Sequence, residues 1–118
     1  MGAGCLYLAP VNPSPENAPP VIINPSSLEN DMLMAADPEK LEVLAYDAEL
    51  DDLYFNWSVP HSVAFQQLPT IQNGDLRISV IEVPRDPILD GSVISCTVSD
   101  VVNPDRTQIV TWNITVTQ

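Results

Sequence analysis

The chain has 118 residues, with 16 acidic side chains against four basic ones and a formal net charge of −12. This length is typical of one domain, and an apolar fraction of 45% can fill one core. A negative charge of this size repels phosphate backbones and anionic lipid surfaces, which argues against nucleic acid as a partner. No apolar run approaches the roughly 20 residues needed to span a bilayer.

Residues 1–20 are rich in proline, with Asn and Ser between the prolines. Such a segment favours extended polyproline-like conformations and spaces a domain from its attachment point. The apolar run Val21-Ile22-Ile23 follows directly and predicts a first strand. The sequence therefore predicts a tether, residues 1–20, and one domain, residues 21–118.

The next segment, Ser27–Met34, predicts a turn of helix, because Ser27 or Asn30 could cap it. From Leu41 onward the sequence has a period of two, which is typical of strands. The stretch Leu41–Tyr46 is strand-like as well, although it has apolar residues on both faces.

Four later segments alternate apolar with polar residues, as half-buried antiparallel strands do. Their apolar sets, which we expect to point inward, are Leu53, Phe55, Trp57 and Val59; Leu76, Ile78 and Val80; Ile94, Cys96 and Val98; and Val110, Trp112, Ile114 and Val116. Turn signals separate them, the strongest being Asn73-Gly74-Asp75, because Asn and Gly tolerate positive φ. About seven short strands at this spacing predict an all-β, antiparallel sandwich.

Several of these segments also carry a family resemblance. Residues 41–47 (LEVLAYD), an acidic turn over residues 48–52, residues 53–57 (LYFNW), Gly91–Asp100 and Thr111–Val116 resemble bacterial immunoglobulin-like, polycystin-repeat and cadherin-like modules. The resemblance covers residues from about 20 to 118. It implies an immunoglobulin-like β-sandwich.

The chain departs from antibody-type domains at two positions. The strand 41–46 has no cysteine to pair with Cys96, and Ile94 stands where a tyrosine corner would have Tyr. The resemblance therefore implies that Trp57 packs over a reduced Cys96.

The N-terminal residues Gly2-Ala3-Gly4-Cys5 resemble the end of a bacterial lipoprotein signal, in which small residues precede a cysteine that becomes lipidated. The residues before Cys5 cannot hold the charged and apolar regions of such a signal. The resemblance implies a lipid anchor at Cys5, and Leu6 after it favours the outer membrane. The alternative is an ordinary cysteine in the tail.

Five acidic residues form a candidate calcium site. Calcium takes six to eight hard oxygen ligands, and the acidic turn with the end of a neighbouring strand offers Asp47, Glu49, Asp51, Asp52 and Asp100. The turn lacks the glycine of the modules that it resembles, and four like charges in a turn are also typical of a solvated loop. Calcium is the only cofactor that the sequence suggests.

A candidate protein-binding patch consists of apolar residues expected to point outward, namely Tyr46, Tyr54, Ile81 and Ile109. Edge strands offer a second binding mode, because they accept an added strand. Catalysis has little support, since His61 is the only histidine and no nucleophile, zinc or phosphate-loop motif is present.

Together these features predict a non-catalytic module of a bacterial cell envelope, lipid-anchored at the outer membrane or cell surface, or secreted. Its expected partner is another envelope or surface protein, and its only membrane contact is a lipid at Cys5. The alternative function is a calcium- or carbohydrate-binding adhesion module of the cadherin-like type.

Overall fold

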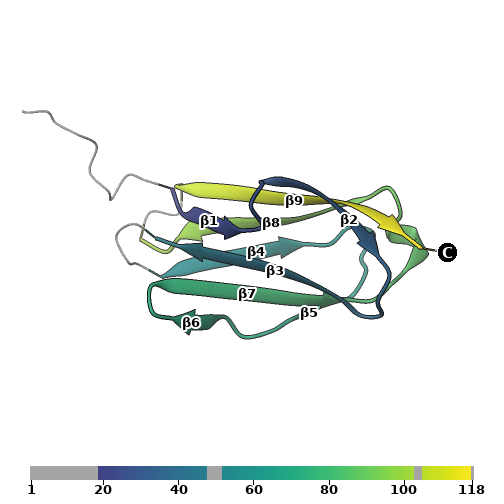
Figure 1. The fold of residues 1–118 in the computed structure, drawn as a ribbon, viewed down its shortest axis with the longest axis horizontal. Helices are drawn as coiled ribbons and strands as arrows, with labels where there is room; N and C mark the ends of the chain where they lie inside the picture. The colour runs from purple at the N-terminus through teal and green to yellow at the C-terminus, as the bar shows by residue number, and fades with distance from the viewer. Residues whose placement is uncertain (1–18, 48–51, 103–104, 118) are drawn as a thin grey trace, which may run out of the picture.

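The computed structural model describes residues 19–47, 52–102 and 105–117, which form two β-sheets packed face to face (Figure 1). One sheet, called here the β3–β7 sheet, has the order β1-β3-β7-β5, with β6 also paired to β7. Its strands are β1 (Val21–Asn24), β3 (Glu39–Tyr46), β5 (Gln66–Gln67), β6 (Ile71–Asn73) and β7 (Leu76–Val83).

The other sheet, called the β8–β9 sheet, has the order β2-β9-β8-β4. Its strands are β2 (Glu29–Met34), β4 (Leu53–Ser58), β8 (Val93–Asp100) and β9 (Thr107–Val116). One turn of 3₁₀ helix, η2 (Pro87–Leu89), is the only helical element among the described residues, and no helix in them could cross a membrane. The prediction of an all-β sandwich is confirmed.

The segment Glu29–Met34 is a strand, so the helical turn predicted over Ser27–Met34 is wrong. This strand, β2, pairs in parallel with β9 from Glu29 opposite Thr111 to Met34 opposite Val116. The Asn30 side chain, expected as a helix cap, instead donates to the backbone oxygen of Thr111 at 3.1 Å. Pairing with the open edge of β9 therefore outweighs the local capping signal, and it makes this one pair of the sheet parallel.

The core lies between the sheets and is centred on two indole rings. Trp57 on β4 and Trp112 on β9 stack with their ring centroids 5.4 Å apart and their planes 17° apart. Cys96, the cross-strand partner of Trp57, is buried and forms no disulfide. The expectation that Trp57 packs beside a reduced Cys96 is confirmed.

The inward face of β7 differs from the predicted one. Ser79, Ile81 and Val83 are buried, whereas Leu76, Ile78 and Val80 are only half-buried and face outward. The inward serine has a specific role, because the Trp57 Nε1–H donates to Ser79 Oγ at 2.9 Å across the sandwich. Ser79 thus occupies a core position because its hydroxyl accepts the hydrogen bond of a buried indole N–H. The alternation of apolar and polar residues does not reveal this role.

The strongest predicted turn is confirmed. Asn73 and Leu76 are cross-strand partners, so Gly74 and Asp75 form a two-residue hairpin loop between β6 and β7. Gly74 has φ of 61°, a conformation that glycine adopts without steric cost.

Candidate functional site

Three of the five acidic residues predicted to bind calcium lie in the described part of the chain, at one end of the sandwich. Asp47 directly follows β3 and is 2% exposed, and Asp100 ends β8 and is completely buried. Asp52 precedes β4, and its side chain is 74% exposed. Glu49 and Asp51 lie outside the described residues. Among the described residues, no group of three or more His, Cys, Asp and Glu side chains could hold a metal ion.

The carboxylate of Asp100 shapes the chain that follows β8. Its Oδ1 accepts a hydrogen bond from the backbone N–H of Val102 at 2.7 Å, in the manner of an Asx-turn. The backbone N–H of Val101 donates to the carbonyl of Asp52 at 3.1 Å. The Asp100 carboxylate therefore orders the exit of β8, and the backbone of Val101 holds it against the start of β4.

A guanidinium also lies at this end of the molecule. The side chain of Arg77, beside Ala45 on the neighbouring strand, is 11% exposed. Its Nε and Nη2 donate to Oδ1 of Asp52 at 3.2 Å, and its Nη1 donates to the backbone oxygens of Gly74 and Leu76. Arg77 thus supplies at Asp52 the positive charge that a bound cation would supply.

The four residues predicted to form an interaction patch do not lie together. Tyr54 and Ile109 are 65% and 52% exposed on the outer side of the β8–β9 sheet. Tyr46 lies half-buried on the outer side of the β3–β7 sheet. Ile81 is completely buried, so the prediction that it points outward is wrong. The error arises because β7 has apolar residues on both faces, and the wrong face was taken as the inward one.

The structure shows a different group of apolar side chains, which was not predicted from the sequence. Cross-strand partners point to the same side of a sheet, and the pairs Leu44–Ile78, Tyr46–Leu76 and Ile71–Ile78 all lie on the outer side of the β3–β7 sheet. We call this group the apolar face; its members are Leu44, Tyr46, Ile71, Leu76, Ile78 and Val80. Ile71 is 54% exposed and the others are half-buried.

Acidic residues border the apolar face. Glu42 is exposed and is the cross-strand partner of Val80, and Asp75 is exposed in the hairpin loop. Lys40 lies at the same side but is paired with Glu82, with Nζ 3.8 Å from Oε2. The rim of the face therefore carries net negative charge.

One sequence signal did point to this face. The strand Leu41–Tyr46 has apolar residues at both even and odd positions, as strands do that are covered on both sides. The segment Leu76–Val83 has the same property, which the sequence reasoning treated as simple alternation. The outer sides of these two strands become one surface only because β3 and β7 are neighbours over eight residue pairs.

The outer side of the β8–β9 sheet is different in chemistry. Its side chains are mainly hydroxyls and amides, from Asn56, Ser58, Ser95, Thr97, Ser99, Thr107, Thr111, Asn113 and Thr115. Its exposed large apolar side chains are Leu33, Tyr54, Val93 and Ile109, and none of them is the cross-strand partner of another. Such isolated residues are normal on protein surfaces.

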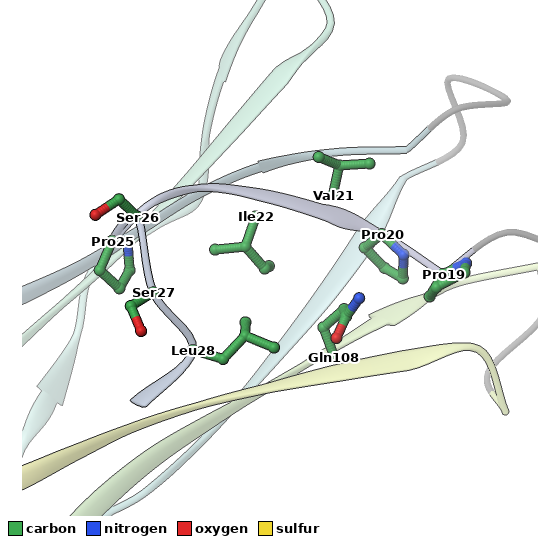
Figure 2. Close-up of a pocket in the computed structure, with 9 residues that line it drawn as sticks. All are labelled: Pro19, Pro20, Val21, Ile22, Pro25, Ser26, Ser27, Leu28 and Gln108. Carbon is green, nitrogen blue, oxygen red and sulfur yellow. The ribbon is translucent and has the colours of Figure 1, made fainter. Parts of the chain in front are cut away.

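An open groove of about 420 Å³ lies between β1, the loop that leads from β1 to β2, and Gln108 of β9 (Figure 2). Ile22 and Leu28 point toward one another across it. Its lining residues are Pro19, Pro20, Val21, Ile22, Pro25, Ser26, Ser27, Leu28 and Gln108. None of these lining residues carries an imidazole, a thiol or a carboxylate.

The single histidine lies on the surface. His61 Nε2 is 2.9 Å from Ser92 Oγ, and both His61 and Ser62 have positive φ, 62° and 57°. His61 is exposed and does not line the open groove. A triad would need a third group that orients the imidazole, and no hydrogen bond of that kind to His61 is found among the described residues.

No protein-family model and no curated protein match the chain. Similar solved structures include titin domain M7, at 16% identity over 86% of this chain and 96% of that one, with a TM-score of 0.54. A complex of titin M10 with an obscurin-like 1 immunoglobulin domain matches at 13% identity over 85% and 95% of the two chains, with a TM-score of 0.46.

The likeness to titin M7 is a likeness of fold, since the sequence identity is low. It agrees with the two facing sheets of the described residues. The described part of the chain thus has the immunoglobulin-like β-sandwich fold.

Proposed function

We propose that this chain is a non-catalytic interaction module of a cell envelope, a lipid-anchored or secreted immunoglobulin-like domain that contacts another protein of a surface assembly. The observation that carries the proposal is the apolar face of the β3–β7 sheet. An antiparallel sheet with a solvated outer side normally has polar residues there, and contiguous exposed apolar side chains are typical of protein contact sites.

The occupant of this face is a protein surface with an apolar centre and a basic rim. The centre matches Ile71, Ile78 and Leu44, and the basic rim matches Glu42 and Asp75. The formal charge of −12 also favours a basic partner, because complementary potentials accelerate association and select partners. Raising the salt concentration should therefore weaken this complex.

The test compares the two outer surfaces with matched substitutions. Ile71→Glu with Tyr46→Ser alters the apolar face, and Ile109→Glu with Tyr54→Ser makes the same chemical changes on the other sheet. Ile71 and Ile109 are similarly exposed, at 54% and 52%, so the two glutamates should affect folding similarly. Tyr46 is half-buried and Tyr54 is exposed, so a melting curve of each variant checks that it is folded. The partner is cross-linked in the native envelope, identified, purified and titrated by calorimetry against each variant.

We expect the apolar-face variant to bind at least about tenfold more weakly, as loss of a buried anchor does, and the control variant to bind within about threefold of the wild type. Equal losses in the two variants, or a loss confined to the control, would show that the partner uses another surface.

The lipid anchor has its own test, because Cys5 lies outside the described residues. A cysteine followed by a proline-rich tether suits a domain held at a distance from a membrane. Mass spectrometry of the protein from its native membrane fraction should find an N-terminal peptide that begins at Cys5 and carries a diacylglyceryl group. An unmodified peptide that extends upstream through Gly4 would contradict the anchor and leave the binding proposal intact.

The alternative is a calcium- or carbohydrate-binding adhesion module. It is favoured by one observation, the burial of Asp47 and Asp100 at the end of the sandwich where the acidic turn lies. Against it, Arg77 already pairs with Asp52. The calcium experiment described in the Discussion separates the two functions.

A further inference from the structure

Strand β4 is an open edge of the β8–β9 sheet. The order β2-β9-β8-β4 ends with it, and no strand among the described residues pairs with its outer side. The carbonyl of Asp52 faces β8, because it accepts from Val101 N–H at 3.1 Å. Since backbone groups of successive residues point to opposite sides of a strand, the N–H and C=O groups of Leu53, Phe55 and Trp57 point to the open side.

A side-chain contact agrees with this orientation. Gln67 Nε2, from β5, donates to the carbonyl oxygen of Phe55 at 3.5 Å. In the described part of the chain it is the one hydrogen bond that reaches the outward backbone groups of β4. A glutamine amide at this distance is a weak and displaceable cap.

The other edges of the two sheets are protected in ways that β4 is not. Edge strand β2 carries Glu29 and Asp31, and β1, β5 and β6 have only four, two and three residues. Strand β4 (LYFNWS) has six residues without a charge or a proline, and its register with β8 is unbroken. Charged side chains, bulges and short length are what prevent edge strands from pairing with other chains.

We propose that β4 pairs antiparallel with β4 of a second copy of this chain, about a two-fold axis at Phe55. Leu53 then lies opposite the partner's Trp57, and Phe55 lies opposite the partner's Phe55. Each such pair exchanges two hydrogen bonds, so the three pairs form about six. One edge completes the other, as two-fold interfaces require.

The edge itself carries no charge that would repel a second copy, although the chain as a whole is acidic. The outward side chains beside the axis, Tyr54 and Asn56, are neutral, so two acidic chains meet where no like charges face each other. The net charge of −12 on each copy still opposes association over longer distances. The dimer should therefore tighten as salt rises, because salt screens this repulsion. A basic partner strand would show the opposite dependence.

Pairing through one short strand buries a small area, so the dimer is weak. The test follows the full chain by sedimentation equilibrium between about 0.05 and 2 mM, a range chosen for such a small interface. Salt is varied from about 50 to 500 mM, over which the Debye length falls severalfold. We expect a monomer–dimer equilibrium whose dissociation constant falls with salt. The amide NMR signals of Leu53, Phe55 and Trp57 should move with concentration, and those of Leu44 and Ile78 should stay fixed.

Charge variants test the register, because Tyr54 lies opposite the partner's Asn56 in this arrangement. Tyr54→Glu with Asn56→Glu places like charges opposite each other twice and should weaken the dimer about tenfold. Tyr54→Lys with Asn56→Glu should restore or exceed the wild-type affinity. The same two pairs of charges at Thr107 and Ile109, on β9 and separated from β4 by β8, control for net charge and should have little effect.

Four results would overturn the proposal. The first is a monomer at every concentration and salt, and the second is an equal loss when the charges are placed on β9. The third is a failure of the Lys/Glu variant to differ from the Glu/Glu variant. The fourth is a concentration dependence confined to amides of the apolar face. The first three results leave the partner proposed for the apolar face untouched, because that partner binds the other sheet. The fourth would show that a second copy binds the apolar face and competes there with the proposed partner.

Discussion

The two sheets share one core but differ on their outer sides. The β8–β9 sheet is covered outside mainly by hydroxyl and amide side chains, among which Leu33, Tyr54, Val93 and Ile109 are exposed. The β3–β7 sheet has the apolar face outside and buried core residues within. A sheet that water covers needs polar residues on that side, whereas a sheet with apolar residues on both sides is typical of a surface that a partner covers.

This difference also decides what alternation can predict. On β4, β8 and β9 one set of positions is polar, so the inward residues follow directly from the sequence, and Phe55, Cys96 and Trp112 are buried as expected. On β7 both sets contain apolar residues. A shift of one residue exchanges the two faces of a strand, and the sequence pattern gave the wrong one.

The largest expected effect compares the two sides of β7 directly. Ile81→Ala should lower the free energy of unfolding by about 2–5 kcal/mol, because it leaves a cavity in the core. Ile78→Ala, on the outer side, should lower it by about 1 kcal/mol or less. Urea denaturation followed by tryptophan fluorescence measures both. A larger loss for Ile78→Ala would mean that the outer side of β7 is the packed one.

A second comparison concerns polar groups inside and outside the sandwich. Ser79→Ala removes the acceptor of the Trp57 indole N–H, and leaving this buried donor without its partner should cost about 1–3 kcal/mol. Ser95→Ala, on the outer side of β8, should change stability by less than about 0.5 kcal/mol. A double-mutant cycle with Trp57→Phe isolates the hydrogen bond, and a coupling free energy near zero would contradict this role of Ser79.

The third prediction concerns the buried thiol of Cys96, on strand β8, whose inward side was predicted correctly. Burial raises the pKa of Cys96 from 9.0 to about 12. The thiol is neutral in both states below pH 9, so its contribution to stability is complete there. Between pH 9 and pH 12 the unfolded chain ionises first, and stability falls by about 1.4 kcal/mol per pH unit.

Urea denaturation at pH 8 and pH 10 should therefore show a loss in the wild type that exceeds the loss in Cys96→Ala by about 1.4 kcal/mol. Comparing the two chains removes the contribution of other titrating groups. Identical pH dependence in the two chains would show that the thiolate is not excluded from the core.

Features that depend on local sequence were predicted, whereas features that depend on contacts between distant residues were not. Strands β3, β4, β8 and β9 and the turn at Gly74 follow from local patterns, the unbridged Cys96 follows from the family resemblance, and all are present. Strand β2 was mistaken for a helical turn. The apolar face required the knowledge that β3 and β7 are neighbours, and strand order depends on contacts between residues far apart in the chain. The parallel pairing of β2 and the hydroxyl of Ser79 in the core depend on such contacts as well.

The smallest expected effect concerns calcium at the acidic end of the sandwich. A site with the affinity of extracellular calcium modules, about 10⁻⁴–10⁻³ M, would stabilise the domain by roughly 1.4–2.7 kcal/mol at about 10 mM calcium and raise its Tm by several degrees. We expect a rise below about 1 °C, because the guanidinium of Arg77 already lies 3.2 Å from Asp52 Oδ1. Magnesium at the same ionic strength controls for screening.

Arg77→Gln makes this last comparison decisive, because it removes the cation that competes for Asp52. If the acidic turn is a solvated loop, calcium changes the Tm of neither the wild type nor the variant. If the turn can bind calcium and Arg77 prevents it, calcium raises the Tm of the variant alone. A rise of several degrees in the wild type would instead favour the adhesion module over the interaction module, since calcium would then bind despite the guanidinium.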